Sequence, residues 1–170
     1  MVINERLEVF TAPELPMSRP GFTKIFLAGT IDLGNSDNWQ SDFIERIKQI
    51  SIKTTTDRFI IYNPRREKFN SNEPQKFENP IINQQIGWEL DRMDHSDVIV
   101  MNILKDSKSP ITLMELGLYA KSGKLLVVCE DGYYRQGNVD FMCSRYNIPL
   151  YRSIGDIRIG DIRNISDRSK

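Results

Sequence analysis

The chain is poor in the residues on which many enzyme and metal sites depend. Among its 170 residues there is one histidine, His95, and there are two cysteines, Cys129 and Cys143. The cysteines form no CxxC pair and have no histidine partner nearby, which argues against a zinc site and against a histidine-based catalytic triad. We expect free thiols in a reducing cytosol, and any acid–base chemistry must come from carboxylates, tyrosine or lysine.

Excess charge and long apolar runs are also missing. Lys plus Arg and Asp plus Glu number 23 each, so no global field draws the chain to nucleic acid or to a membrane surface. The longest apolar runs have about the length of a strand, and the N-terminus lacks the apolar core of a signal peptide. Neither a Walker loop nor a GxGxxG turn is present, which argues against a P-loop NTPase or a dehydrogenase. We therefore expect a cytoplasmic protein.

Strand-like and helix-like patterns alternate along the chain. Apolar runs predict strands, and apolar residues at helical spacing follow each of the first four. This alternation predicts an α/β fold, namely a flavodoxin-like (Rossmann-like) doubly wound parallel sheet of about five strands with the order 2-1-3-4-5. The predicted strands are 24–28, 59–62, 97–103, 125–129 and 149–151.

The boundaries follow from the same pattern. We expect one domain over residues 24–152, an irregular lead-in over 1–23 with one short strand at Leu7–Phe10, and a tail over 153–170. A helix should start at about Pro80, with Ile82, Ile86, Leu90 and Met93 as its buried stripe.

The stretch from Ser109 to Ala120 predicts the central helix. Ser109 is expected at the N-cap and proline at the first helical position. Ile111, Met114 and Leu118 are expected to form the inward stripe, with Glu115 beside it. A glycine at 117 would let another backbone come close.

Ligands of such sheets bind outside the carboxyl ends of the strands. This rule selects residues that follow the predicted strands, and we expect them to face one crevice. The selected residues are Gly29, Thr30, Ile31, Asp32, Asn63, Pro64, Arg65, Arg66, Ser109, Glu115, Gly137 and Asn138.

A long polar loop runs from Arg65 to Asn79. Its length is unusual for a compact domain, which favours a lid over the site.

Two glutamates are the candidates for chemistry. Glu115 lies in the early turns of its helix, where the helix dipole keeps a carboxylate ionised. Glu89 lies at the edge of a buried stripe, where desolvation raises the pKa of a carboxyl group towards that of a general acid. One nucleophile and one acid–base group form the pattern of glycosyl transfer. The alternative for Glu115 is a glutamate that is merely favoured by the helix dipole. The alternative for Glu89 is a surface ion pair with Arg92 or with a lysine at helical spacing.

Several motifs follow one another along the chain. They are Phe26-Leu27-Ala28-Gly29-Thr30-Ile31, Ile61-Tyr62-Asn63-Pro64-Arg65-Arg66, Trp88-Glu89, Ser109 to Ala120, and Arg135-Gln136-Gly137-Asn138-Val139-Asp140. In this order they resemble the motifs of the nucleoside 2-deoxyribosyltransferase-like proteins, and the resemblance covers about residues 24–152.

This resemblance implies a function and a set of roles. Glu115 would be the nucleophile that attacks C1′ of a nucleoside or nucleotide, and Glu89 would assist proton transfer. Ser109 and Asn138 would hold the sugar, Asn138 from a neighbouring subunit in some members, so a homo-oligomer is expected. No metal or organic cofactor is implied. Many members carry a tyrosine in the first strand where this chain has Phe26.

Three readings stay open. The first is base exchange on a nucleoside. The second is hydrolysis of a nucleoside 5′-monophosphate, for which Ser109 and Arg65 or Arg66 would bind the phosphate; NAD cleavage, as in TIR-like relatives, ranks below it. The third is a non-catalytic nucleotide sensor, because a fold does not fix a function. Trp39 or Trp88 could stack on the base, although a buried tryptophan is the commoner case.

Overall fold

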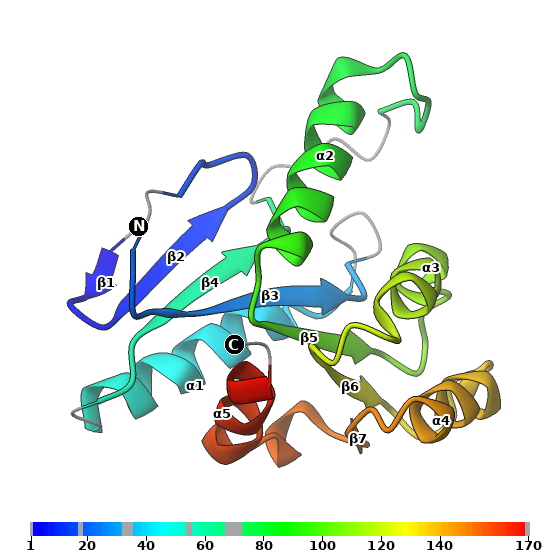
Figure 1. Ribbon diagram of the computed structural model, residues 1–170. Helices are drawn as coiled ribbons and strands as arrows, with labels where there is room; N and C mark the ends of the chain where they lie inside the picture. The colour runs from blue at the N-terminus through cyan, green and yellow to red at the C-terminus, as the bar shows by residue number, and fades with distance from the viewer. Residues whose placement is uncertain (1, 17–18, 32–35, 54–55, 67–72, 169–170) are drawn as a thin grey trace. The chain divides into compact units, whose positions relative to one another are not determined.

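The computed structural model describes the chain except for residues 1, 17–18, 32–35, 54–55, 67–72 and 169–170 (Figure 1). The chain divides into two compact units. The first comprises residues 1–26 and 33–96, and the second comprises residues 27–32 and 97–170. Strand β3 (Thr23–Gly29) contributes its first residues to one unit and its last to the other.

The first unit holds the strands β1 (Val2–Asn4), β2 (Leu7–Thr11) and β4 (Phe59–Asn63), with the start of β3. Their order is β1-β2-β4-β3. Strands β2 and β3 pair with β4 in parallel, whereas β1 pairs with β2 antiparallel. The predicted short strand at Leu7–Phe10 is thus confirmed as β2.

Two helices belong to the first unit. Helix α1 (Trp39–Lys53) packs on β4 through Trp39, Phe43 and Ile47. Helix α2 (Pro80–Asp94) begins as predicted, with proline at its first position and the Asn79 side chain accepting a hydrogen bond from the Ile81 N–H at 3.0 Å.

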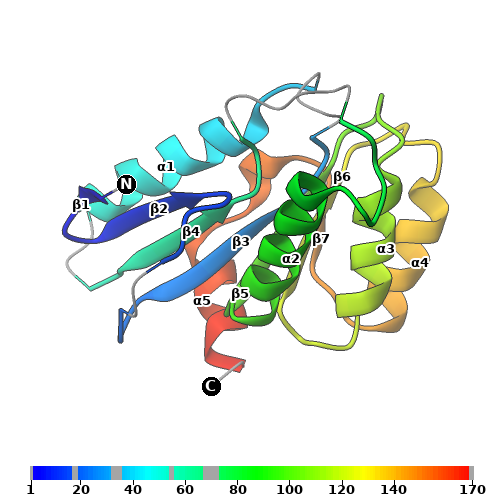
Figure 2. The ribbon, with the colours of Figure 1, turned by 90° about the horizontal axis from the view of Figure 1, so that it is seen from above.

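The second unit continues from β3 with β5 (Val98–Ile103), β6 (Leu125–Cys129) and β7 (Leu150–Tyr151), in the order β3-β5-β6-β7. Strand β6 pairs in parallel with β5 on one side and with β7 on the other. Helices α3 (Pro110–Tyr119) and α4 (Gln136–Arg145) run side by side (Figure 2).

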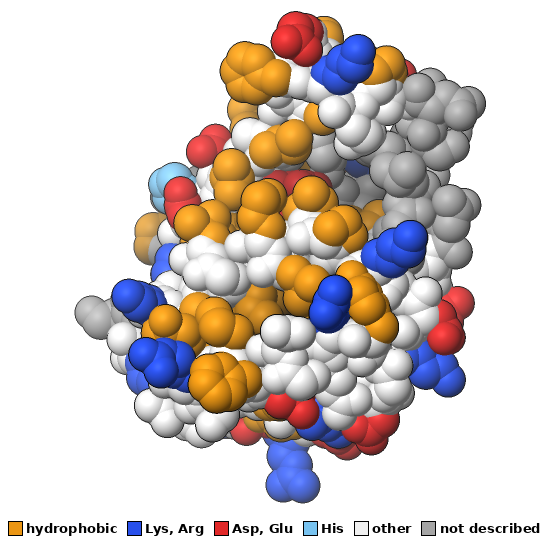
Figure 3. Space-filling view, turned by 90° about the vertical axis from the view of Figure 1, so that its right-hand side faces the viewer, with side chains coloured by type: hydrophobic (Ala, Val, Ile, Leu, Met, Phe, Trp, Pro, Cys, Tyr) orange, Lys and Arg blue, Asp and Glu red, His pale blue; other side chains and the backbone are white. Residues whose placement is uncertain are grey.

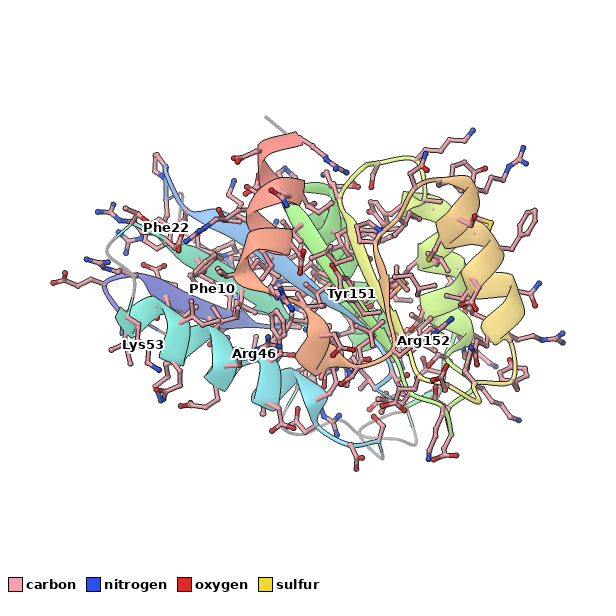
Figure 4. The ribbon with its side chains drawn as sticks, turned by 90° about the horizontal axis from the view of Figure 1, so that it is seen from below. Phe10, Phe22, Arg46, Lys53, Tyr151 and Arg152 are labelled. Atoms are coloured by element: carbon pink, nitrogen blue, oxygen red, sulfur yellow. The ribbon has the colours of Figure 1, made fainter. Side chains whose placement is uncertain are left out.

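The chain ends with a short 3₁₀ turn, η2 (Ile154–Asp156), and helix α5 (Ile159–Arg168), which contacts β5 and β6. Arg152, which is labelled in Figure 4, directly follows β7. It binds Asp140 of α4 with two guanidinium nitrogens at 2.9 and 2.8 Å. This charge-assisted pair ties the residue after β7 to the middle of α4.

The predicted flavodoxin-like α/β fold is confirmed, with the predicted strands in the predicted order. The sheet has seven strands instead of about five, because β1 and β2 extend it beyond β4. In the parts of the chain that the model describes, no helix has the length and apolar character needed to cross a membrane.

The predicted burial of two helices was wrong. On α3, Ile111, Met114 and Leu118 are 57%, 65% and 63% exposed, and the buried residues are Thr112, Glu115, Leu116 and Tyr119. On α2, Ile82 and Met93 are buried, but Ile86 and Leu90 are exposed and Gln85 and Trp88 take their place. An apolar stripe on a helix can pack into the core of its own chain or can remain on the surface as an apolar patch. The sequence alone does not distinguish these two cases.

Candidate functional site

Three hydroxyl groups meet where α3 begins, all of them in the second unit. The Thr30 Oγ1 atom lies 2.6 Å from Ser109 Oγ and 3.0 Å from Ser107 Oγ, and the two serine oxygens are 2.7 Å apart. Thr30 also accepts the Leu104 N–H at 3.1 Å. All three side chains are buried, so β3 and the loop after β5 meet through hydroxyl groups at this point.

Ser109 occupies the N-cap of α3 as predicted, but it does not cap the helix. Its backbone is left-handed (φ 44°, ψ 48°), and its side chain makes no capping hydrogen bond. The hydroxyl is turned to Thr30 and Ser107 instead. A non-glycine residue in this region is strained by about 1 kcal/mol or more, and such strain persists only where the surroundings hold it.

The loop before α3 is held from a second side. The Tyr133 hydroxyl donates to the Lys108 carbonyl at 2.7 Å, and the Glu130 carboxylate accepts the Lys105 N–H at 2.9 Å. Burial raises the pKa of Tyr133 to about 12, so its hydroxyl stays a donor at neutral pH. The loop after β6 therefore helps to fix the residues that lead into α3.

Glu115 lies on the buried face of α3, only 9% exposed, between Thr112 and Tyr119. The predicted carboxylate is therefore largely buried, which a glutamate that served only the helix dipole would not require. The neighbouring Gly117 does not admit a backbone, contrary to expectation. A Cβ atom there would meet nothing within 4 Å, because the residue faces outward.

The close backbone approach occurs at Gly29 instead. Its φ angle is 128°, and a Cβ atom would lie 2.1 Å from the Asn102 carbonyl oxygen. The next N–H, that of Thr30, donates to the same carbonyl at 2.9 Å. Gly29 therefore lets the end of β3 lie against β5, which sets the position of Thr30.

Asn138 lies on the outer side of the second unit. It lines an open groove between α3 and α4 with a volume of about 420 Å³. Figure 3 shows hydrophobic side chains gathered on this side of the molecule. The exposed Phe141 of α4 and the exposed stripe of α3 flank it. The groove is lined by Leu113, Leu116, Gly117, Arg135, Asn138, Val139 and Met142.

In the first unit, two arginines follow β4 and differ in their contacts. The Arg65 guanidinium donates to the carbonyl oxygens of Ser36 and Asp37 at 2.7 and 3.0 Å, and the Asn63 side chain accepts the Arg65 N–H at 3.0 Å. Arg65 and Asn63 thus hold the local chain. The Nε atom of Arg66 is buried and has no hydrogen-bond partner in the described structure, so Arg66 is the better candidate for an anion.

Glu89 of α2 is half-buried beside Gln85. The Gln85 amide nitrogen donates to Glu89 Oε1 at 2.6 Å and to the Pro64 carbonyl at 2.9 Å. Burial raises the pKa of the Glu89 carboxyl group, whereas the Gln85 hydrogen bond and the charge of Arg66 oppose the rise. The expected raised pKa of Glu89 is confirmed. Arg92 instead lies over the Tyr62 ring at 5.6 Å, so the alternative ion pair has no support.

Trp88 is part of the core of the first unit. It is 5% exposed, donates its ring N–H to the Glu14 carbonyl at 2.7 Å, and packs against Phe26 and Tyr62. Phe26, at the strand position where the resemblance in sequence would place a tyrosine, is 1% exposed. No hydroxyl group is therefore supplied from there.

The two thiols, the possible metal ligands and Asp32 are the remaining candidates for a functional role. Burial raises the pKa of Cys129 to about 11 and that of Cys143 to about 12, so neither thiol is a nucleophile at neutral pH. Among the residues placed by the model, no group of three His, Cys, Asp or Glu side chains is arranged to hold a metal ion. The predicted site residue Asp32 lies outside the described residues.

Sequence reasoning missed Ser107, Tyr133 and Gln85. Two of them have weak signals in the sequence. Ser107 lies two positions before Ser109, and Gln85 lies four positions, or one helical turn, before Glu89. For Tyr133, which acts across 25 residues, the sequence carries no such signal.

Doubly wound α/β sheets bind their ligands outside the carboxyl ends of the parallel strands, and the hydroxyl groups and Glu115 lie after the ends of β3 and β5. A family model described as "nucleoside 2-deoxyribosyltransferase like" matches residues 23–133, and the chain belongs to this family. The match covers Thr30, Glu89, Ser109 and Glu115, and it ends before Asn138. A search of curated proteins finds no match.

Proposed function

We propose that this protein transfers the glycosyl group of a nucleoside or deoxynucleoside, or of its nucleotide, from one nucleobase to another. A Glu115 carboxylate oxygen forms a bond to C1′ while the bond from C1′ to the base nitrogen breaks. Glu89 supplies the proton that the departing base takes up. A nitrogen of a second base then attacks C1′, the glutamyl ester bond breaks, and Glu89 takes back the proton that this nitrogen carried.

The observation that carries this proposal is the burial of Glu115 on the inner face of α3. Glutamate side chains are rarely this buried, so a largely buried carboxylate on the helix that begins at the three hydroxyl groups is a strong candidate for the nucleophile. Gly29, Thr30 and Ser109 would lie against the sugar in this proposal. The family match supports the class of reaction, with a nucleoside as the substrate.

Hydrolysis of a nucleoside 5′-monophosphate is the second candidate. Ser109 leaves the first N–H groups of α3 without a side-chain cap, and such groups suit an anion. Neutral hydroxyl groups can donate to phosphate oxygens where a carboxylate would repel them. Water would then take the place of the second base and release the sugar phosphate.

One assay separates these candidates. The protein is incubated with a deoxynucleoside or its 5′-monophosphate, with and without a second free base, and the products are resolved by chromatography. A new nucleoside indicates exchange, and loss of substrate without exchange indicates hydrolysis. Binding without turnover of any substrate would contradict an enzyme and favour a nucleotide sensor.

Self-association belongs to the same proposal. Ile111, Met114 and Leu118 of α3 and Phe141 of α4 expose apolar side chains on either side of the groove that contains Asn138. A second copy of the chain would cover this surface and bring Asn138 to a neighbouring subunit. We therefore propose that the protein acts as a homo-oligomer, at least a dimer.

A further inference from the structure

We propose that Gln85 is a positioning residue for Glu89, and that its carboxamide decides which of the two carboxyl oxygens carries the proton. The geometry assigns that proton to Oε2. The catalytic meaning of this assignment rests on the proposed function, whereas the assignment itself does not.

The Gln85 amide is held at two points. Its Nε2 atom donates to the Pro64 carbonyl at 2.9 Å and to Glu89 Oε1 at 2.6 Å, which uses both hydrogens of the amide. Pro64 directly follows β4, so one anchor belongs to the end of the sheet. Gln85 is 8% exposed and lies one helical turn before Glu89. The side chain therefore has little freedom to move.

The orientation of the amide has one favourable solution. If the carboxamide were turned over, its carbonyl oxygen would face two acceptors, the Pro64 carbonyl and the Glu89 carboxylate. The observed orientation leaves Gln85 Oε1 buried without a partner in the described structure. A buried carbonyl without a partner destabilises the folded state, so the two donated hydrogen bonds must outweigh that cost.

The position of the proton follows from this donor. Glu89 Oε1 accepts from an N–H group, so a hydrogen on Oε1 would point at another hydrogen. A protonated Glu89 must therefore carry its proton on Oε2, and only Oε2 can donate to a ligand. The positive charge of Arg66 favours the ionised form of Glu89, and so does the Gln85 hydrogen bond. Unlike the charge, the hydrogen bond acts on one particular oxygen, Oε1.

The influences on the pKa of Glu89 agree with this geometry. Burial is the largest influence on Glu89 and raises the pKa of its carboxyl group, and the Gln85 hydrogen bond is the largest influence in the opposite direction. Gln85 thus limits the proton affinity of Glu89. A general acid has to release its proton as well as hold it.

The chain contains a matched control for the experiment. On α1, Gln49 donates to Glu45 at 2.8 Å with the same one-turn separation, but this pair is exposed. There the hydrogen bond lowers the pKa of Glu45. The pair lies on the surface of one helix, whereas Gln85 is buried and also binds the Pro64 carbonyl. The two variants are Gln85→Met and Gln49→Met, in which methionine keeps the length of the side chain and removes its donor.

Carboxyl-carbon NMR titration, with signals assigned through Glu89→Gln and Glu45→Gln, measures the proposal directly. We expect Gln85→Met to move the titration of Glu89 to higher pH and to lower kcat about tenfold with KM little changed. We expect Gln49→Met to move only Glu45 and to leave turnover unchanged. An unmoved Glu89 titration in folded Gln85→Met would overturn the proposal, whatever happens to turnover.

A measurement on the unaltered site covers the case in which Gln85→Met does not fold. The infrared difference spectrum between the wild type and Glu89→Gln at low pH reports the carbonyl stretch of protonated Glu89. We expect a frequency lowered by a hydrogen bond to Oε1, and the frequency of a free carbonyl would overturn the proposal. If instead Glu89→Gln keeps full turnover, the catalytic role of Glu89 fails while the assignment of the proton stands.

Discussion

Thr30 and Ser109 hold each other across 79 residues of sequence, with their hydroxyl oxygens 2.6 Å apart. The serine at the N-cap thus fastens α3 to the end of β3 and leaves the first turn of its own helix uncapped. Side-chain caps commonly stabilise a helix by about 1 kcal/mol, which this arrangement forgoes. An arrangement of this kind keeps the helix N-terminus available for a ligand.

Glu115→Gln should abolish turnover without unfolding the protein. The substitution keeps the size and polarity of the side chain but removes the nucleophilic oxygen. We expect turnover to fall on the order of 10³-fold or more, as it does when a catalytic unit is broken. Product chromatography measures the loss and circular dichroism checks the fold. Near-normal turnover in a folded variant would contradict the central role of Glu115.

Ser109→Asp should discriminate between substrates with and without a phosphate. A carboxylate at the start of α3 repels a phosphate group, whereas it can accept a hydrogen bond from a sugar hydroxyl. We expect kcat/KM for a 5′-monophosphate to fall at least about tenfold more than kcat/KM for the free nucleoside. Equal losses for both substrates, or a wild type that ignores monophosphates, would leave Ser109 with a structural role alone.

Gly29→Ala should destabilise the fold while Gly117→Ala should not. The new Cβ atom at position 29 would lie 2.1 Å from the Asn102 carbonyl, and we expect the free energy of unfolding to fall by about 3 kcal/mol. At position 117, in an open helical site, alanine should stabilise by up to about 1 kcal/mol. Urea denaturation measures both, and similar stabilities of the two variants would show that β3 and β5 can separate at low cost.

Glu89→Gln should stabilise the protein at neutral pH. Because burial raises the pKa of Glu89 above its ordinary value of 4.5, the folded state binds the proton more tightly than the unfolded state. The stability that Glu89 contributes is therefore complete below about pH 4.5 and is lost as the pH rises through the raised value. Thermal unfolding should favour Glu89→Gln over the wild type at pH 7 and much less at pH 4.

Glu45→Gln is the control for this pH dependence. Its pKa is lowered, chiefly by the Gln49 hydrogen bond, so the sign of the effect reverses. The stability contributed by Glu45 is present above its ordinary value and is lost as the pH falls. A Glu89→Gln variant that behaves like Glu45→Gln would contradict the desolvation of Glu89.

Met114→Lys should weaken self-association. Met114 is 65% exposed at the centre of the apolar stripe of α3, and a charge there cannot be buried against a second copy without cost. Light scattering should show the wild type above the monomer mass of 19.7 kDa and the variant shifted towards it. Ile52→Lys, at an exposed apolar position of α1, should leave association unchanged. A wild type that is monomeric at every working concentration would exclude this interface.

The sequence was sufficient for the parts of the fold that depend on local pattern. Continuous apolar runs predicted β3, β4, β5 and β6, and Pro80 and Pro110 marked the starts of two helices. Strand β1 was not predicted, because edge strands carry mixed residues and resemble loops in composition. The tail over 153–170, for which no helix was predicted, contains α5 with the buried Ile165.

For the candidate site, the sequence predicted residue types better than their partners. Glu89 was expected to be desolvated, and its raised pKa agrees. The exposed stripe of α3 was assigned to the core because Ile111, Met114 and Leu118 are apolar, and this error also hid the inward position of Glu115. The contact of Thr30 with Ser109 depends on the pairing of β3 with β5, which only the fold creates.

The division of β3 between the two units has a consequence for how the chain can be cut. The second unit needs residues 27–32 as well as residues 97–170, so no continuous fragment contains it alone. A polypeptide that starts at Asp97 lacks Thr30, which leaves the Leu104 N–H and the hydroxyl groups of Ser107 and Ser109 without their shared partner. The hydrogen bonds at the start of α3 therefore form only when residues 27–32 pair with the segment 97–170.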